Sequence, residues 1–222
     1  MNVVEKSDSV SSLALHKFGG SSLADAACYT RVANLLISHS QSQDLVVVSA
    51  AGKTTNKLIK LASIARQGVD FLPLLNQLQY FQQQLVIKLI QQPDALLAQL
   101  ETDFTALKYW LDSDVISECT ANKVVGCGEV WSSRLLSTLL TQLGRVSCAI
   151  DARDFLVADG MVTPIVDELI SRQKLTSLSQ HCLASQRVIT GFICANEQQD
   201  TLLLGRNGSD YSATLVAKLA GA

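Results

Sequence analysis

Short, continuous apolar runs alternate along this chain with longer stretches in which apolar residues recur about every three or four positions. The runs are typical of strands buried on both faces of a parallel sheet, and the longer stretches are typical of amphipathic helices. Strands are expected at 11–18, 44–50, 146–150, 162–166, 187–195 and 201–204, and helices at 23–38, 56–67, 124–143, 166–175 and from about 209. This alternation predicts an α/β class with a mainly parallel sheet.

Between about 70 and 119 the pattern changes to helical spacing alone. Two leucine- and glutamine-rich stretches are separated by Pro93 and Asp94, a pair that breaks helices. We expect a helical hairpin here, packed at one edge of the sheet. Its apolar stripes are more typical of structural packing than of a cofactor site.

The first expected strand ends in a turn that begins with a cation, Lys17, and continues through Gly19, Gly20 and Ser21. Glycine amides and an ammonium group suit a phosphate. A tight turn with an exposed lysine would have the same sequence, so the signal is weak alone. The helix after the turn has Ser22 as its expected N-cap.

A second glycine turn lies near the C-terminus, where Gly205, Arg206 and Gly208 follow an apolar run. Ser209 and Asp210 stand where a helix N-cap is expected. Free backbone N–H groups and the helix dipole would favour an anion there, and the Arg206 guanidinium suits a carboxylate or phosphate. A capped turn with a surface arginine is the alternative interpretation.

The turn after the second strand contains Gly52, Lys53 and Thr54, which invites comparison with a P-loop. That motif requires a glycine at the position of Val47, which lies within an apolar run, so the loop is too short to wrap a phosphate. Thr54 and Thr55 stay candidates for hydroxyl contacts with a ligand, although such threonines often cap helices.

A further glycine-containing stretch opens the helix expected from 124. Gly126 and Gly128 make its entry irregular, with Glu129 expected in the first turn. A carboxylate there would either lie at the surface, favoured by the helix dipole, or face a cation such as the ammonium of a substrate.

Several of these candidates converge on one edge of the expected sheet. Parallel sheets bind ligands beyond the carboxyl ends of their strands. The residues at or just beyond such ends are Lys17, Thr55, Gly191, Phe192 and Arg206. Their convergence indicates a binding site more strongly than any single turn does.

Composition narrows the functional classes. The 222 residues are 48% hydrophobic and 17% charged with a net charge of -2, so we expect a sizeable core and no nucleic acid partner. Residues 1–12 are polar and expected to be flexible; they form no signal peptide, and no apolar run is long enough for a membrane span. The six cysteines form no C-x-x-C pair and are expected to be buried free thiols in a reducing cytoplasm, without a metal site.

Taken together, five segments resemble aspartokinases, and among them the kinase part of bifunctional aspartokinase/homoserine dehydrogenases: 17–22, 47–56, 126–132, 190–193 and 204–213. The resemblance implies the amino acid kinase (carbamate kinase-like) fold, a three-layer αβα sandwich, over residues 13–222. It also implies transfer of the γ-phosphate of MgATP to the β-carboxylate of L-aspartate, on the route to lysine, methionine and threonine. A cytoplasmic homo-oligomer is expected.

The same resemblance implies roles at the phosphate. Lys17 would neutralise the transferring phosphoryl group, and Asp210 would hold Lys17 in place. The backbone of Gly19, Gly20 and Ser21 would bind the ATP phosphates.

For the acceptor, the resemblance implies that Arg206 binds an aspartate carboxylate and Glu129 its ammonium. Thr55 and Ser209 would add hydrogen bonds. Because the β-carboxylate is already ionised at neutral pH, no general base is required. No tightly bound cofactor and no metal held by protein side chains are implied.

The chain ends at Ala222, before the segments that in aspartokinases hold the adenine and ribose. The resemblance therefore implies an incomplete kinase domain. We expect it to fold, to self-associate through its uncovered edge, and not to turn over ATP alone. A kinase for glutamate or N-acetylglutamate, and a non-catalytic assembly module, are the alternatives.

Overall fold

A four-stranded parallel sheet forms the centre of the protein. The computed structural model describes residues 13–181, 185–205 and 207–222, so the expected flexible segment 1–12 lies outside the described residues. The sheet has the strand order β1 (Leu15–Phe18), β2 (Leu45–Val48), β6 (Gln186–Thr190) and β3 (Ser147–Ile150), and every pairing is parallel. The predicted parallel sheet is confirmed, and the carboxyl ends of its strands share one edge.

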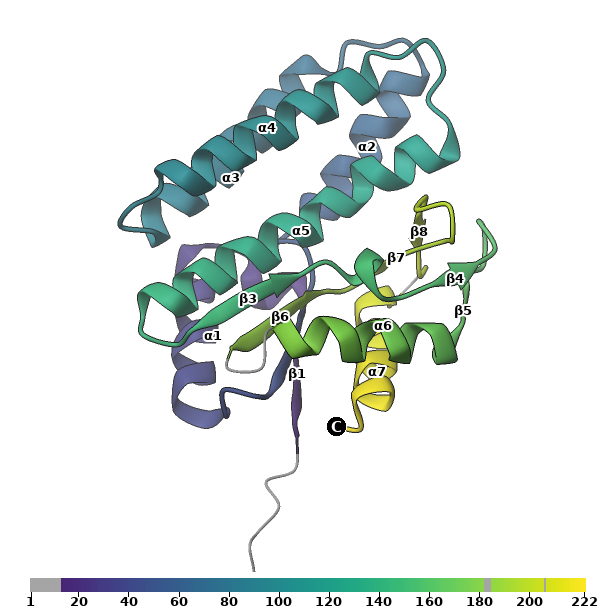
Figure 1. Cartoon of the computed structure of the whole chain (residues 1–222). Coiled ribbons are helices and arrows are strands. Elements are labelled where there is room, and N and C mark those ends of the chain that lie inside the picture. Colours follow the sequence, from purple (N-terminus) through teal and green to yellow (C-terminus); the bar gives the residue numbers. More distant parts are fainter. Residues whose placement is uncertain (1–12, 182–184, 206) are drawn as a thin grey trace, which may run out of the picture.

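Helices cover both faces of this sheet (Figure 1). One face carries α1 (Ala26–His39), α2 (Thr54–Arg66) and α5 (Glu118–Gln142), and the other carries α6 (Glu168–His181) and α7 (Gly208–Ala220). Successive side chains of a strand point to opposite faces. Accordingly, Val46 and Val48 of β2 belong to the core under the first set of helices, and Leu45 and Val47 belong to the core under the second. The predicted three-layer αβα sandwich is confirmed.

The helical hairpin expected between 70 and 119 consists of α3 (Leu72–Leu89) and α4 (Asp94–Leu111). It packs against α1, α2 and α5, so its predicted position at an edge of the sheet is wrong. The reason is that α5 is apolar on two sides. Leu136 and Leu140 are buried, and so are Trp131 and Leu135, which line a pocket with α3 and α4. A helix that is apolar all round requires a second covering layer.

Two short antiparallel hairpins flank the main sheet. One pairs β7 (Ile193–Ala195) with β8 (Thr201–Leu203), and the other pairs β4 (Ala158–Asp159) with β5 (Ile165–Val166), after the 3₁₀ turn η2 (Ala152–Asp154). The strand predicted at 187–195 is therefore divided after Thr190, and its two parts belong to different sheets. Phe192 has a φ of 69°, and this left-handed residue turns the chain out of the sheet after β6.

Two predicted helix caps are also wrong. The first turn forms a 3₁₀ helix, η1 (Gly20–Leu23), and α1 is capped by Asp25, whose Oδ1 accepts from the Cys28 N–H at 2.8 Å. At α7 the N-cap is Asn207, in the left-handed region with a φ of 57°. Ser209 and Asp210 consequently lie inside the first turn of α7.

Two further expectations from the sequence concern membrane spans and cysteines. Among the described residues, no helix combines the length and the apolar character that a membrane span needs. The cysteines that the structure describes are free thiols, as predicted. Cys194 is buried, but Cys28, Cys119, Cys127 and Cys148 are half-buried, so their expected full burial is wrong.

Candidate functional site

A cleft of about 330 Å³ lies beyond the carboxyl ends of β1, β2 and β6. Most of the predicted site residues line it: Lys17, Gly19, Gly20, Thr55, Glu129, Ser209 and Asp210. Ser21 is exposed in η1 and is not among the lining residues. Arg206 lies outside the described residues, whereas Gly205 and Asn207 line the cleft. The edge of the sheet that the sequence indicates is therefore the edge where these side chains meet.

An ion pair forms one side of the cleft. Lys17, from the end of β1, places its Nζ 2.7 Å from Oδ1 of Asp210, in the first turn of α7. The ammonium lies over Gly19, where an added Cβ would be 3.4 Å from Nζ. The cation is thus fixed at the mouth of the glycine turn before any ligand arrives.

Two backbone turns form the floor beside this pair. The Gly52 N–H donates to the Gly20 carbonyl at 2.9 Å. A Cβ on Gly20 would lie 2.9 Å from the carbonyl oxygens of both Ala50 and Gly52, so a side chain would separate the turns. Glycine is required at position 20 for this close approach.

Glu129 forms the opposite wall and is almost completely buried, with 2% of its surface exposed. Its Oε1 accepts from the Ala50 N–H at 3.2 Å and from the Thr55 hydroxyl at 3.4 Å. Its Oε2 has no hydrogen-bond partner among the described residues. Burial raises the pKa of Glu129 to about 8, although the hydrogen bonds from Ala50 and Thr55 act in the opposite direction.

The predicted place of Glu129 in a first helical turn is wrong, because α5 begins eleven residues earlier, at Glu118. Gly126 and Gly128 are not an irregular entry but contact points in mid-helix. A Cβ on Gly128 would lie 2.7 Å from the Ala50 Cβ and 3.1 Å from the Thr54 Cγ2. The missing side chain lets α5 approach the start of α2, which brings Glu129 to the cleft.

The start of α7 is held at the cleft by the turn after β6. Ser212 accepts a hydrogen bond from the Phe192 N–H at 2.8 Å. A Cβ on Gly191 would lie 2.9 Å from the Ser209 Cβ, so this glycine lets the first turn of α7 pack on the end of β6. Gly191, one of the residues predicted at a strand end, therefore lies directly against the start of α7.

Comparison with known proteins agrees with this arrangement. The family model described as "Amino acid kinase family" matches residues 12–222. The chain belongs to the amino acid kinase family. It is 44% identical over 212 residues to the bifunctional aspartokinase/homoserine dehydrogenase 2 of Escherichia coli, a match that covers 93% of the chain and 26% of that protein. It is 29% identical to a chloroplastic bifunctional aspartokinase/homoserine dehydrogenase 1 of Zea mays, over 99% of the chain and 25% of that protein.

Solved structures show the same fold. Aspartokinase III of E. coli, in complex with aspartate and ADP, matches with a TM-score of 0.86 and 24% identity, over 95% of this chain and 47% of that one. The resemblance to aspartokinases is confirmed by these relatives. The chain spans about a quarter of the length of the two bifunctional relatives.

Among the residues that line the cleft, Ser49, Lys53 and Asn56 were assigned no site role from the sequence. Lys53 stands at the N-cap position of α2. The Gly52–Lys53–Thr54 turn was considered only as a P-loop, and the position of the turn at the end of β2 was the signal that could have placed Lys53 in the cleft.

The described residues were also compared with the side-chain clusters that hold metal ions in proteins. Across the described ranges, no group of three or more His, Cys, Asp or Glu side chains is placed to hold a metal ion.

Proposed function

We propose that this chain binds L-aspartate and MgATP and takes part in transfer of the γ-phosphate to the aspartate β-carboxylate, the reaction of an aspartokinase. Family membership and the names of the relatives support this choice within the amino acid kinases. The observation that carries it is Glu129, a buried carboxyl whose Oε2 lacks a described partner at a cleft that also holds an ammonium group.

The acceptor would bind against the Glu129 wall. A buried oxygen without a partner is costly, and a substrate ammonium would supply the missing hydrogen bond and charge. The Thr55 and Ser209 hydroxyls line the same cleft and would hydrogen-bond the acceptor. Arg206, between two lining residues, would bind one of its carboxylates through the guanidinium fork.

The phosphate would bind on the opposite side, where Lys17 lies over Gly19. The attacking β-carboxylate is ionised at neutral pH and needs no base. The difficulty is to bring one anion against another, so the cleft must supply positive charge and fixed positions. Lys17, held by Asp210, would stabilise the charge on the transferring phosphoryl group, and the Gly19 and Gly20 backbone would position the phosphates.

Magnesium fits this site as a companion of the nucleotide. Mg²⁺ keeps several waters and is commonly bound through substrate phosphates and few carboxylates. When bound, it would neutralise phosphate charge. The cytoplasmic location and the homo-oligomeric state stay predictions from the sequence.

Isothermal titration of the full-length protein with L-aspartate, L-glutamate and N-acetylglutamate tests the proposal. We expect a preference for aspartate, and loss of roughly ten- to hundredfold in affinity in Glu129→Gln, because a charge-assisted hydrogen bond is removed. Glu118→Gln, at the exposed start of the same helix, is the matched control. Since a substrate ammonium favours ionised Glu129, binding below about pH 8 should release a proton.

Each rival predicts a different result. Preference for glutamate or N-acetylglutamate would assign the cleft to another amino acid kinase. Absence of binding for all three, together with no ADP release, would leave a non-catalytic module.

A further inference from the structure

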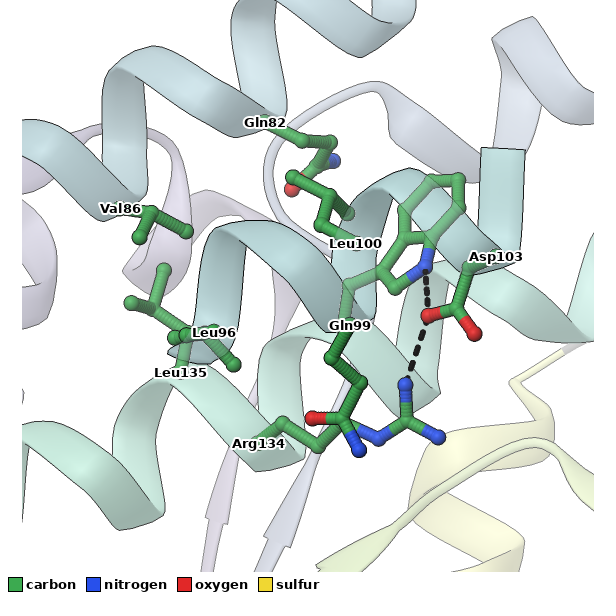
Figure 2. A pocket seen from close by; sticks show the side chains of 9 residues that line it. Gln82, Val86, Leu96, Gln99, Leu100, Asp103, Arg134 and Leu135 are labelled. Atoms are coloured by element: carbon green, nitrogen blue, oxygen red, sulfur yellow. Dashed lines mark hydrogen bonds and ion pairs between the residues drawn. The ribbon is translucent and has the colours of Figure 1, made fainter. Parts of the chain in front are cut away.

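The helical hairpin contacts α2 and α5, the two helices that carry Thr55 and Glu129, through polar side chains in an otherwise apolar joint. Figure 2 shows the pocket between α3, α4 and α5, with Gln82 and Asp103 on its lining. Its volume of about 10 Å³ is too small for a metabolite. The contact between the hairpin and α5 is therefore closely packed. Buried polar groups in such a contact are normally hydrogen-bonded, so their partners show what they hold together.

Asp103 fixes α4 to α5. Its Oδ2 accepts from the Trp131 Nε1–H at 3.0 Å and from the Arg134 Nη1–H at 2.6 Å (Figure 2). The Trp131 ring also stacks on Phe104, with ring centroids 4.7 Å apart. These contacts immobilise α5 at a point two residues beyond Glu129.

Gln82 fixes α3 to the start of α2. Its Nε2–H donates to the Thr54 Oγ1 at 3.1 Å. Both side chains are buried, with 4% of Gln82 and 1% of Thr54 exposed. The Thr54 methyl group faces the place where Gly128 lacks a side chain, so Thr54 is held from two sides.

We propose that Gln82 is a positioning residue for the acceptor wall: through Thr54 it holds the first turn of α2, and with it the Thr55 hydroxyl, in register with Glu129. The inference rests on the proposed function for the identity of the ligand, and on the described contacts for the coupling. Asp103 holds the same hairpin to α5, so that the position of Gln82 is fixed relative to Glu129.

The Thr55–Glu129 hydrogen bond is sensitive to the position of the first turn of α2. Its oxygen–oxygen distance of 3.4 Å lies at the long limit of a hydrogen bond. A displacement of a few tenths of an ångström at the start of α2 would break it. Without Gln82, the buried Thr54 hydroxyl loses its hydrogen-bond partner. This unsatisfied group is costly, so the first turn of α2 would shift to relieve it.

The test uses four variants of the full-length protein: Gln82→Met, Thr54→Val, their combination, and Gln79→Met as the control. Gln79 lies on the same helix, one turn earlier, and donates a solvent-exposed hydrogen bond to Glu101 of α4 at 2.7 Å. Steady-state ADP release gives kcat and the KM values for aspartate and MgATP. Circular dichroism shows whether each variant is folded.

We expect Gln82→Met and Thr54→Val each to raise the aspartate KM about tenfold, with the MgATP KM unchanged, on the scale of one unsatisfied buried group. The double variant should be no worse than either single variant, because both remove one interaction. If Gln82→Met does not fold, Thr54→Val tests the same bond from its other side. Equal behaviour of Gln82→Met and Gln79→Met, or additive single effects, would overturn the proposal.

A second readout separates this inference from the proposed function. The Glu129 carboxyl can be titrated by carbon NMR without any ligand, with Glu129→Gln assigning the signal. Gln82→Met should raise the Glu129 pKa further above its ordinary value, because the Thr55 hydrogen bond that favours the ionised carboxylate is lost, whereas Gln79→Met should not. If the wild-type protein did not bind aspartate, only the proposed function would be rejected. If the Glu129 pKa were the same in Gln82→Met and wild type, the positioning role of Gln82 would be rejected.

Discussion

The Lys17 ammonium lies 2.7 Å from the Asp210 carboxylate, joining the end of β1 to the first turn of α7. The side chains are 26% and 64% exposed. An ion pair this open to water contributes only about 0–1 kcal/mol to the free energy of unfolding. The ion pair therefore matters for position more than for stability, because it holds the Lys17 ammonium at the glycine turn.

Lys17→Ala should lower kcat by about 10²–10⁴, the scale observed when one preorganised charge contact is removed. The aspartate KM and the melting temperature should change little. ADP release and thermal unfolding measure both effects. Lys218→Ala, which removes the exposed pair with Glu168, is the control for loss of a surface ion pair. If kcat held and only the aspartate KM rose, Lys17 would act on the acceptor instead of the phosphate.

The buried Glu129 carboxyl should make stability depend on pH. Its pKa is about 8 in the folded protein, against an ordinary value of 4.5. Below the lower value it is protonated in both states. Between the two values the unfolded chain releases a proton that the folded chain keeps, so the free energy of unfolding falls as pH rises.

Glu129→Gln should remove this contribution. Relative to wild type, the variant should gain melting temperature progressively between about pH 5 and 8 and then keep a constant difference. Calorimetry at a series of pH values, without ligand, measures it, with Glu118→Gln as the exposed control. A pH-independent difference would mean that Glu129 is ionised in the folded protein.

The layers of this fold could be predicted from sequence because burial leaves a local period. The apolar run of β2 and the helical spacing on each side of Pro93 are examples. The position of the α3–α4 hairpin could not be predicted, since an apolar stripe does not identify its partner. Which of two covering layers a stripe meets depends on residues distant in sequence, here Trp131 and Leu135 of α5.

The site shows the same division. The glycine turns indicated the correct edge of the sheet, because turn chemistry is local. Gly128 was misinterpreted as a helix entry, because its reason is a contact with Ala50 and Thr54 far along the chain. Lys17 and Asp210 come from opposite ends of the sequence, so their pairing was expected only through the resemblance to aspartokinases.

Gly128→Ala should destabilise the protein, whereas Gly126→Ala should be close to neutral. Alanine favours a helix over glycine by about 1 kcal/mol in both cases. At Gly128 the new Cβ would lie 2.7 Å from the Ala50 Cβ, an overlap that typically costs about 1–3 kcal/mol. At Gly126 the nearest atom is the Ile193 Cγ2 at 3.1 Å, so the new Cβ would require a shift of only a few tenths of an ångström. Urea denaturation compares them, and equal stability would show that α5 and α2 can separate freely.

Lys53 should attract the anionic substrates without being required for the chemistry. It is exposed at the N-cap position of α2 and lines the cleft, where Lys17 is already paired with Asp210. A charge about 4 Å from an anion at an exposed site is worth about 1 kcal/mol, or roughly fivefold in affinity. Lys53→Ala should therefore raise the KM of aspartate or MgATP about fivefold at low salt and leave kcat nearly unchanged, while Lys53→Arg should restore the wild-type value.

Salt separates this electrostatic role from a packing role. The screening length falls from about 10 Å at 0.1 M to about 3 Å at 1 M ionic strength, so the difference between Lys53→Ala and wild type should shrink as salt is added. Lys60→Ala provides the control, because Lys60 is exposed on the same helix and is not among the residues that line the cleft. A KM effect of Lys53→Ala that persists at high salt would instead assign Lys53 a direct contact with the substrate, and equal effects of the two alanine variants at low salt would remove Lys53 from the site.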